Sequence, residues 1–187
     1  MKRWKYRAVF LDRDGVINKK APEGDYVKNW DEFQFLLGIK EAIRKLNEKG
    51  FLVIVVSNQR GIAEGAMTED DLKEIHARMK EELRKEGAVI NGIYYCPHDI
   101  KDHCDCRKPK PGLLLRAARE HDIDLCRSWM IGDRESDIEA GKGAGCKTIL
   151  IRSSPLNDIS ESIEPDLVAK SLAEAVEKLL GLSLIHI

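Results

Sequence analysis

Five short apolar runs recur along this chain, and a stretch with helical periodicity separates each run from the next. The runs are nearly continuous rather than alternating, which is typical of strands that are covered on both faces. They span Ala8–Leu11, Phe51–Val56, Gly92–Cys96, Trp129–Gly132 and Thr148–Ile151. Strands that alternate with helices predict βαβ units, and therefore an α/β fold in which a parallel sheet has helices on both faces.

The helical stretches carry start and stop signals. Thr68 is a favourable N-cap for a helix with apolar positions over Leu72–Leu83, and Gly87 ends it. Further helices are expected at Ile39–Leu46, from Pro111 onward, at Glu135–Gly145 and at Leu172–Leu180. No linker divides the chain, so residues 1–180 are predicted to form one domain. The segment 181–187, GLSLIHI, has no partner element and is expected to be a non-native or disordered tail.

The bulk composition excludes several classes of protein. Of 187 residues, 43% are hydrophobic and 34% are charged, as in globular domains rather than disordered chains. A formal net charge of −1 gives no electrostatic reason to expect nucleic acid or a membrane surface as a partner. The N-terminal apolar run is too short for a signal peptide, and no stretch approaches the ~20 apolar residues of a membrane span. We expect a cytoplasmic protein, and a monomer because no large exposed apolar stripe is evident.

Polar side chains follow the predicted strands at the point where each strand ends. Because the carboxyl ends of parallel strands meet at one edge of the sheet, these side chains are expected to converge. They are Asp12 and Asp14 after the first strand, Ser57, Asn58 and Gln59 after the second, Arg107 and Lys108 beyond the third, and Asp133 after the fourth. Acids, a hydroxyl and a lysine on one rim predict a functional site.

This set of side chains suits the transfer of a phosphoryl group. Asp12, Asp14 and Asp133 supply hard oxygen ligands of the kind that Mg²⁺ prefers. A hydroxyl, an amide and a lysine can donate to phosphoryl oxygens, and metal and lysine together neutralise their charge. One aspartate would attack phosphorus and form an aspartyl phosphate. The second, two residues away, would protonate the departing alcohol and later take a proton from water.

Four segments resemble the four motifs of the haloacid dehalogenase (HAD) superfamily, in their order and spacing. They read FLDRDGVIN, VVSNQRGIAEG, CRKPKPG and MIGDRESDIEAG, within residues 8–152. The likeness is greatest to the small members that hydrolyse D-glycero-D-manno-heptose 1,7-bisphosphate at the 7-position, and to the related histidinol-phosphate phosphatases. It implies a Rossmann-like fold without a large cap domain, and a Mg²⁺-dependent phosphatase that acts on a small phosphorylated sugar.

The resemblance also implies a role for each matching residue. Asp12 would be the nucleophile and Asp14 the general acid and base. Asp133 would bind Mg²⁺, together with Asp12 and the main-chain carbonyl of Asp14. Ser57 and Lys108 would hold the phosphoryl group. The remaining contacts with substrate would come from Asn58, Gln59, Arg107 and Arg134.

A second metal site is predicted in the loop after the third strand. Cys96, His98, Cys104 and Cys106 are soft or borderline ligands that lie close enough in sequence to share one tetrahedral zinc ion. A Cys104–Cys106 disulfide or free thiols are the alternatives, but dense thiols in a cytoplasmic chain favour zinc. Four protein ligands close the site, so the zinc would be structural. The loop 96–106 would then hold the cations that follow it toward the phosphate.

Other interpretations stay open at this point. The segments NQRGIAEG, NGIYYCPH and KPKPGLLL favour the heptose enzymes, whereas the five residues between His98 and Cys104 look more like the histidinol-phosphate type. A receiver-type signalling domain also places acids, a hydroxyl and a lysine at strand ends, but it has no use for Asp14 as an acid and base. Asp137 is expected to orient the site rather than bind metal. His76 is expected on a helix surface.

Overall fold

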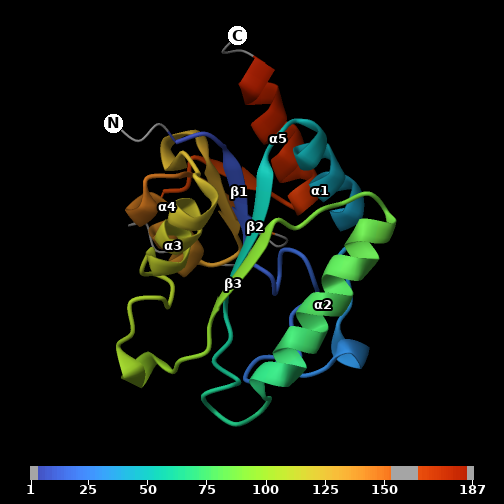
Figure 1. The fold of residues 1–187 in the computed structure, drawn as a ribbon, viewed down its shortest axis with the longest axis vertical. Helices are drawn as coiled ribbons and strands as arrows, with labels where there is room; N and C mark the ends of the chain where they lie inside the picture. Colours follow the sequence, from blue (N-terminus) through green and yellow to red (C-terminus); the bar gives the residue numbers. More distant parts are fainter. Residues whose placement is uncertain (1–3, 153–163, 185–187) are drawn as a thin grey trace.

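The computed structural model describes residues 4–152 and 164–184 and contains one parallel β-sheet (Figure 1). The strand order is β3-β2-β1-β4-β5-β6, and all neighbours run in parallel. The strands are β1 (Ala8–Leu11), β2 (Leu52–Asn58), β3 (Gly92–Cys96), β4 (Trp129–Gly132), β5 (Lys147–Ile151) and β6 (Leu167–Ala169). The predicted fold class is confirmed. The sequence did not predict β6, since three residues carry too little periodicity.

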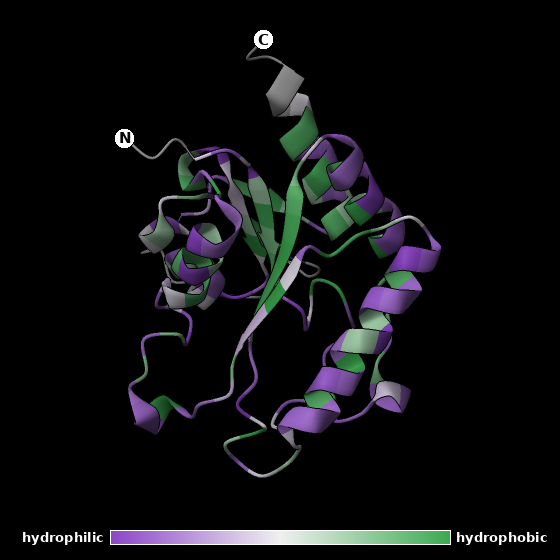
Figure 2. Ribbon diagram, viewed as in Figure 1, coloured by the Kyte–Doolittle hydropathy of each residue, from purple (hydrophilic) through white to green (hydrophobic). Residues whose placement is uncertain are grey.

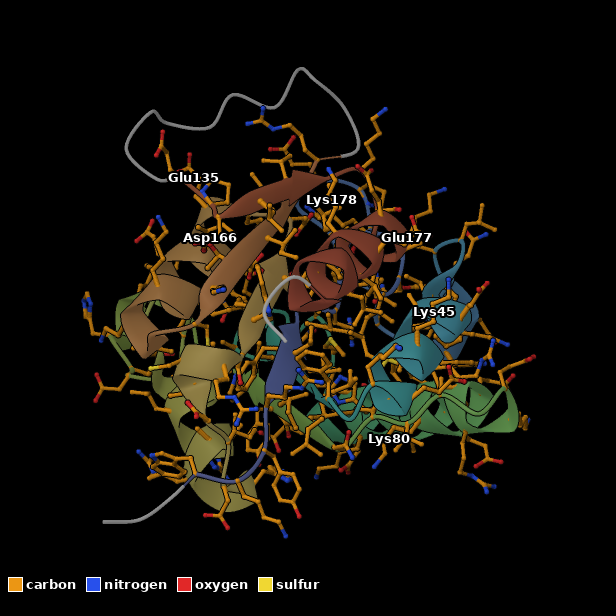
Figure 3. The ribbon with its side chains drawn as sticks, turned by 90° about the horizontal axis from the view of Figure 1, so that it is seen from above. Lys45, Lys80, Glu135, Asp166, Glu177 and Lys178 are labelled. Atoms are coloured by element: carbon orange, nitrogen blue, oxygen red, sulfur yellow. The ribbon has the colours of Figure 1, made fainter. Side chains whose placement is uncertain are left out.

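Helices cover both faces of the sheet, as the view from above shows (Figure 3). They are α1 (Ile39–Glu48), α2 (Glu69–Lys85), α3 (Gly112–His121), α4 (Glu135–Ala144) and α5 (Leu172–Leu184). The helices α1, α2 and α5 pack on one face, and α3 and α4 pack on the other. Lys45 on α1 and Glu177 on α5 point away from the sheet (Figure 3). Over residues 4–152 and 164–184, no helix has the length and apolar character that a bilayer crossing requires.

Two hydrophobic cores form because successive side chains of a strand point to opposite faces. In β1, Val9 and Leu11 pack with residues of α1 and α2, whereas Ala8 and Phe10 pack with residues of α3 and α4. All four are fully buried, which explains why this central strand reads as one continuous apolar run. Figure 2 shows the same division, with apolar strands lying between helices that carry many hydrophilic residues.

The helix ends follow the predicted capping residues. Thr68 caps α2, since its hydroxyl accepts a hydrogen bond from the N–H of Asp71 at 3.1 Å. The Asp71 carboxylate accepts in turn from the N–H of Thr68 at 2.8 Å, which completes a capping box. The helix α5 continues to Leu184, so the segment 181–187 begins as helix, and its end lies outside the described residues.

The loops at the carboxyl ends of the strands differ in length. Residues 12–38, after β1, contain the 3-10 helix η1 (Trp30–Glu32), and the loop after β3 contains η2 (Ile100–Asp102). The loop after β2 reaches α2 through residues 59–68. Within the described part of the chain, none of these loops carries an inserted cap domain.

The chain changes direction across the sheet between β1 and β4. From β1 it moves outward to β2 and β3, and it then returns to β4 on the other side of β1. In open parallel sheets the loops diverge at such a switch point and leave a crevice, where ligands bind. The loops that follow β2 and β3 reach the lower end of the molecule in Figure 1. The predicted site residues therefore follow strands that end at the switch point.

Candidate active site

Asp12, Lys108 and Asp137 form a buried cluster at the carboxyl ends of β1 and β4. Nζ of Lys108 lies 2.9 Å from Oδ1 of Asp12 and 2.6 Å from Oδ1 of Asp137. It also donates to the main-chain oxygen of Val56 at 2.8 Å, so three acceptors meet its three protons. All three charged residues are less than 9% exposed. The fold thus joins Asp12 to a lysine 96 positions away.

Asp137 holds this cluster together from the first turn of α4. Its Oδ2 accepts hydrogen bonds from the N–H groups of Asp133 and Arg134, both at 3.1 Å, while its Oδ1 faces Lys108. Gly132 permits this close approach, since a Cβ there would lie 2.1 Å from the Cβ of Asp137. Protein groups occupy both oxygens, which is the arrangement expected of an orienting residue.

Asp133 lies beside Asp12 on the same rim. Its Oδ2 contacts Nζ of Lys20, whereas its Oδ1 is buried and has no hydrogen-bond partner among the described residues. Gly15, with φ of +94°, packs directly against this carboxylate, and a Cβ on it would lie 2.3 Å from Oδ2. One carboxylate oxygen from each of Asp12, Asp133 and Asp137 lies within 4.8 Å of the other two.

This cluster carries surplus negative charge. Burial raises the pKa of Asp12 to about 7 against the lowering effect of Lys108, and Asp137 and Asp133 add to the rise. Burial also raises the pKa of Asp133, against the effect of Lys20. Burial lowers the pKa of Lys108, but the two carboxylates beside it outweigh burial and raise that pKa overall. A divalent cation would relieve this repulsion, so the donor set fits Mg²⁺.

Asp14 has a separate set of hydrogen-bond donors. Nη2 of Arg13 lies 2.9 Å from one of its carboxylate oxygens and 3.0 Å from the other. Asn18 Nδ2 donates to Oδ1 at 2.8 Å, and Gln59 Nε2 donates to Oδ2 at 3.0 Å. Burial raises the pKa of Asp14, but Arg13 and these hydrogen bonds outweigh burial and lower the pKa. The Asp14 side chain keeps 28% exposure and lines the cleft described below.

The three polar residues at the end of β2 bind protein groups in this structure. The Asn58 amide clamps the main chain of Lys108, because Nδ2 donates to its carbonyl at 3.0 Å and Oδ1 accepts from its N–H at 3.1 Å. The Gln59 amide donates to Oγ of Ser57 at 2.7 Å as well as to Asp14. In this arrangement all three residues position the lysine and the second aspartate.

A cleft of about 1070 Å³ opens above Asp12 and Asp14. The loops after β1, β2 and β3 and the start of α4 line it, and Arg107 and Arg134, two of the predicted substrate residues, reach it together with Asn58, Gln59 and Lys108. Further cations on its walls are Lys20, Arg60 and Lys110. The walls also carry Glu23, Asp25 and Asp99, and Asp99 pairs with Arg60, so Lys20, Lys110, Arg107 and Arg134 are the cations that suit a substrate with more than one negative charge.

Cys96, His98, Cys104 and Cys106 come together after β3, as a shared metal requires. Cys96 Sγ lies 3.6 Å from His98 Nδ1 and 3.5 Å from Cys104 Sγ, and Cys106 Sγ lies 3.3 Å from His98 Nδ1 and 3.5 Å from Cys104 Sγ. Tetrahedral zinc, with bonds of about 2.0–2.3 Å, spaces its ligand atoms by about 3.3–3.8 Å, so the four residues fit it. The Cys104–Cys106 disulfide is not formed, since all these cysteines are free.

The cysteine cluster is tied to the cations that follow it in sequence. Burial raises the pKa of Cys104, but the N–H of Arg107 and the neighbouring cysteines lower it more, to about 7. Arg107 Nη1 also donates to the carbonyl of His98 at 3.3 Å. Lys110 Nζ donates to the carbonyl of Cys104 at 2.8 Å. The path of this loop therefore sets where Arg107 and Lys108 lie.

Three residues near the site were not predicted from the sequence. Arg13 is fully buried, and Lys20 reaches the carboxylate cluster. His76, expected on the surface, is only 7% exposed, and its Nε2 lies 3.4 Å from Nη1 of Arg13. The surface prediction for His76 is wrong because position 76 follows Leu72 by four residues and precedes Met79 by three, on the buried face of α2. That spacing is the signal that could have found it.

The fold and the carboxylate–lysine site define the class of this protein, a phosphatase of the HAD type. Residues 105–175 match the model of the HAD-hydrolase-like family. Over 184 residues the chain is 40% identical to the D-glycero-beta-D-manno-heptose-1,7-bisphosphate 7-phosphatase of Pasteurella multocida, covering 94% of this chain and 98% of that protein. A Helicobacter pylori enzyme of the same name is 42% identical over 152 residues, and the match covers 80% of this chain and 86% of that enzyme. The chain belongs to this family of heptose-bisphosphate phosphatases.

The solved structures include a similar protein. D,D-heptose 1,7-bisphosphate phosphatase from B. bronchiseptica, complexed with magnesium and phosphate, superposes with a TM-score of 0.83 at 34% identity. The match covers 94% of this chain and 99% of that one. The likeness therefore extends over nearly the whole fold.

Proposed function

We propose that this protein is a Mg²⁺-dependent phosphatase that removes the phosphate at position 7 of D-glycero-D-manno-heptose 1,7-bisphosphate. The meeting of Asp12, Lys108 and Asp133 at the switch point carries the proposal, because it supplies a nucleophile, a cation and a metal ligand in one place. The choice of substrate is supported by relatives named for it that are about 40% identical over most of the chain. The magnesium and phosphate of the B. bronchiseptica structure support the metal and the reaction type.

Asp12 and Asp133, together with the main-chain carbonyl of Asp14, are the groups that would hold Mg²⁺. The unpartnered Oδ1 of Asp133 and the surplus charge of the cluster support this assignment. When bound, Mg²⁺ neutralises charge on the phosphoryl oxygens. Lys20 contacts the Asp133 carboxylate, so its ammonium competes with the ion for this ligand.

Asp12 acts as the nucleophile in the first half of the reaction. One of its carboxylate oxygens forms a bond to phosphorus while the bond between phosphorus and the sugar oxygen breaks. Because its pKa is lowered, Asp14 is ionised before substrate binds, so it takes a proton from the bound phosphate monoester and gives it to the departing sugar oxygen, and the sugar leaves as an alcohol. Lys108 faces the attacking carboxylate, and its charge stabilises the negative charge that passes to the phosphoryl oxygens.

Water completes the reaction. Its oxygen attacks the phosphorus of the aspartyl phosphate, Asp14 takes its proton, and the bond between phosphorus and Asp12 breaks. The products are inorganic phosphate and the regenerated Asp12 carboxylate. Asn58 holds the main chain of Lys108, and Asp137 holds its ammonium group. The cation therefore stays in place through both halves of the reaction.

The walls of the cleft would select the substrate. Arg107 and Arg134 are suited to the sugar and to its second phosphate, because guanidinium groups bind phosphate oxygens in pairs. Zinc held by the cysteine cluster would act as a structural clamp on the loop that carries Arg107. The cytoplasmic location and the monomeric state stay predictions, and gel filtration tests the second.

A phosphate-release screen tests the proposed function. The substrates are both anomers of the heptose 1,7-bisphosphate, histidinol phosphate and simple sugar phosphates, each with Mg²⁺ and with EDTA. We expect the highest kcat/KM on a heptose bisphosphate, a product that keeps its 1-phosphate, and loss of turnover in EDTA. Faster hydrolysis of histidinol phosphate than of the heptose bisphosphates would contradict the proposed substrate. Stoichiometric phosphorylation without turnover would instead indicate a receiver-type domain.

A further inference from the structure

Arg13 is the largest fully buried side chain among the described residues, and the mechanism above gives it no task. A guanidinium without access to water needs partners for its charge and its donors. Its main partner is the next residue, Asp14. Nη2 reaches both carboxylate oxygens of Asp14, at 2.9 and 3.0 Å, and Nε lies 3.3 Å from Oδ1.

The fold decides the direction of Arg13. Val9 and Leu11 point to the sheet face that α2 covers, and Arg13 continues their alternation past the end of the strand. There it meets His76 of α2, whose Nε2 lies 3.4 Å from Nη1. Tyr95 on β3 packs against the imidazole with ring centroids 5.8 Å apart. The guanidinium therefore contacts the imidazole of His76 through Nη1 and the carboxylate of Asp14 through Nη2 and Nε.

The remaining donors to Asp14 complete a rigid setting. Asn18 donates to Oδ1 and Gln59 donates to Oδ2, so protein donors fix both oxygens from three directions. Ser57 in turn fixes the Gln59 amide. Within this setting the carboxylate still faces the cleft, next to Asp12. A group that must exchange protons with a substrate oxygen gains rate from such fixed geometry.

We propose that Arg13 is a positioning residue, whose buried guanidinium holds the carboxylate of Asp14 where it can protonate the departing sugar oxygen and then deprotonate water. This inference rests on the proposed function, because it assigns Arg13 a task within that reaction. A purely structural Arg13 would affect every substrate and every step alike. A positioning Arg13 affects only the steps that use the acid and base.

Two esters separate these cases. A sugar phosphate needs a proton on its leaving oxygen, whereas p-nitrophenyl phosphate releases a stable phenolate without one. When Asp14 is misplaced, the bond from phosphorus to nitrophenolate still breaks as Asp12 is phosphorylated. The following attack by water is slow, because it lacks its base. The signature is a burst of about one nitrophenolate for each active site, followed by slow turnover.

The test compares Arg13→Gln and Arg13→Lys with the wild type and with Asp14→Asn. General acid–base catalysis contributes roughly 10²–10⁴-fold, so we expect kcat on the heptose bisphosphate to fall about 100-fold in Arg13→Gln and less in Arg13→Lys. We expect the burst with p-nitrophenyl phosphate in Arg13→Gln and in Asp14→Asn. Arg44→Gln, on the exposed side of α1, is the matched control and should keep wild-type kinetics.

A double-mutant cycle completes the test. In the Asp14→Asn background, Arg13→Gln should cause little further loss of kcat, since its effect passes through Asp14. Equal losses on both esters without a burst, or additive losses in the cycle, would overturn the inference. Arg13→Lys keeps the buried charge, so it decides the matter if circular dichroism shows Arg13→Gln to be unfolded. If the wild type cleaves another alkyl phosphate but not the heptose bisphosphate, the proposed substrate fails, and the same comparison on that ester still tests Arg13.

Discussion

Acid should destabilise this protein through one buried histidine, His76. Burial and, after it, the charge of Arg13 lower its pKa to about 3 against the opposing effect of Asp14, while the ring of Tyr95 packs beside it. In the unfolded chain the same group has the ordinary pKa of 6.5. The stability that the neutral imidazole contributes is therefore complete above about pH 6.5. It is lost as the pH falls from there toward about 3, because only the unfolded state takes up a proton.

Proton linkage gives the size of this effect. Between about pH 7.5 and about pH 5, protonation of the unfolded histidine alone lowers the free energy of unfolding by about 2 kcal/mol. The folded-state pKa hardly enters this figure as long as it lies below about 4, since the native imidazole then stays neutral across the whole range. The side chain is 7% exposed, so solvent screening does not reduce the effect greatly.

Urea unfolding of the wild type and of His76→Gln at both pH values measures this contribution. Glutamine can still accept a hydrogen bond from Arg13 but cannot be protonated, and every other acid-sensitive group, the cysteine cluster included, is common to both proteins. Relative to the wild type, the free energy of unfolding of His76→Gln should rise by about 2 kcal/mol between about pH 7.5 and about pH 5. His121→Gln, which replaces a histidine on α3, is the control. Parallel pH dependence in the wild type and His76→Gln would refute the reasoning.

Four further outcomes are expected. Asp12→Asn should abolish phosphate release in a folded protein, since one less carboxylate relieves repulsion in the cluster, and retained turnover would remove Asp12 as the nucleophile. Lys108→Met should lower the free energy of unfolding in urea by about 3–5 kcal/mol, because two buried carboxylates lose their counter-ion. A loss below about 1 kcal/mol would show that the lysine is not needed to stabilise these carboxylates. Cys104→Ser should lower both the zinc content and the thermal midpoint, and elemental analysis that finds no zinc in wild-type protein purified without chelator would contradict the zinc site. Lys20→Gln should tighten Mg²⁺ binding about two- to fivefold in calorimetry, because a competing but half-exposed cation is gone, and unchanged affinity would show that Lys20 does not compete.

Much of the site could be predicted because parallel strands deliver their last residues to one edge. Asp12, Asp133 and Lys108 were expected together, and the structure brings them into one rim. The contacts of Asn58 and Gln59 could not be predicted, since an amide at a strand end can face either a substrate or the protein. Here Asn58 binds the main chain of Lys108, and Gln59 binds Asp14.

The pattern of apolar runs and the acids that follow them determined the fold class, the location of the site and its chemistry. These features depend on short stretches of chain, whose periodicity and capping are local properties. Only the tertiary structure decided that Arg13 is buried against His76, that Lys108 joins Asp12 to Asp137, and that Lys20 reaches Asp133. Each of these contacts joins separate segments of the chain. Charge pairing between such segments follows from how the helices pack on the sheet, which no local pattern encodes.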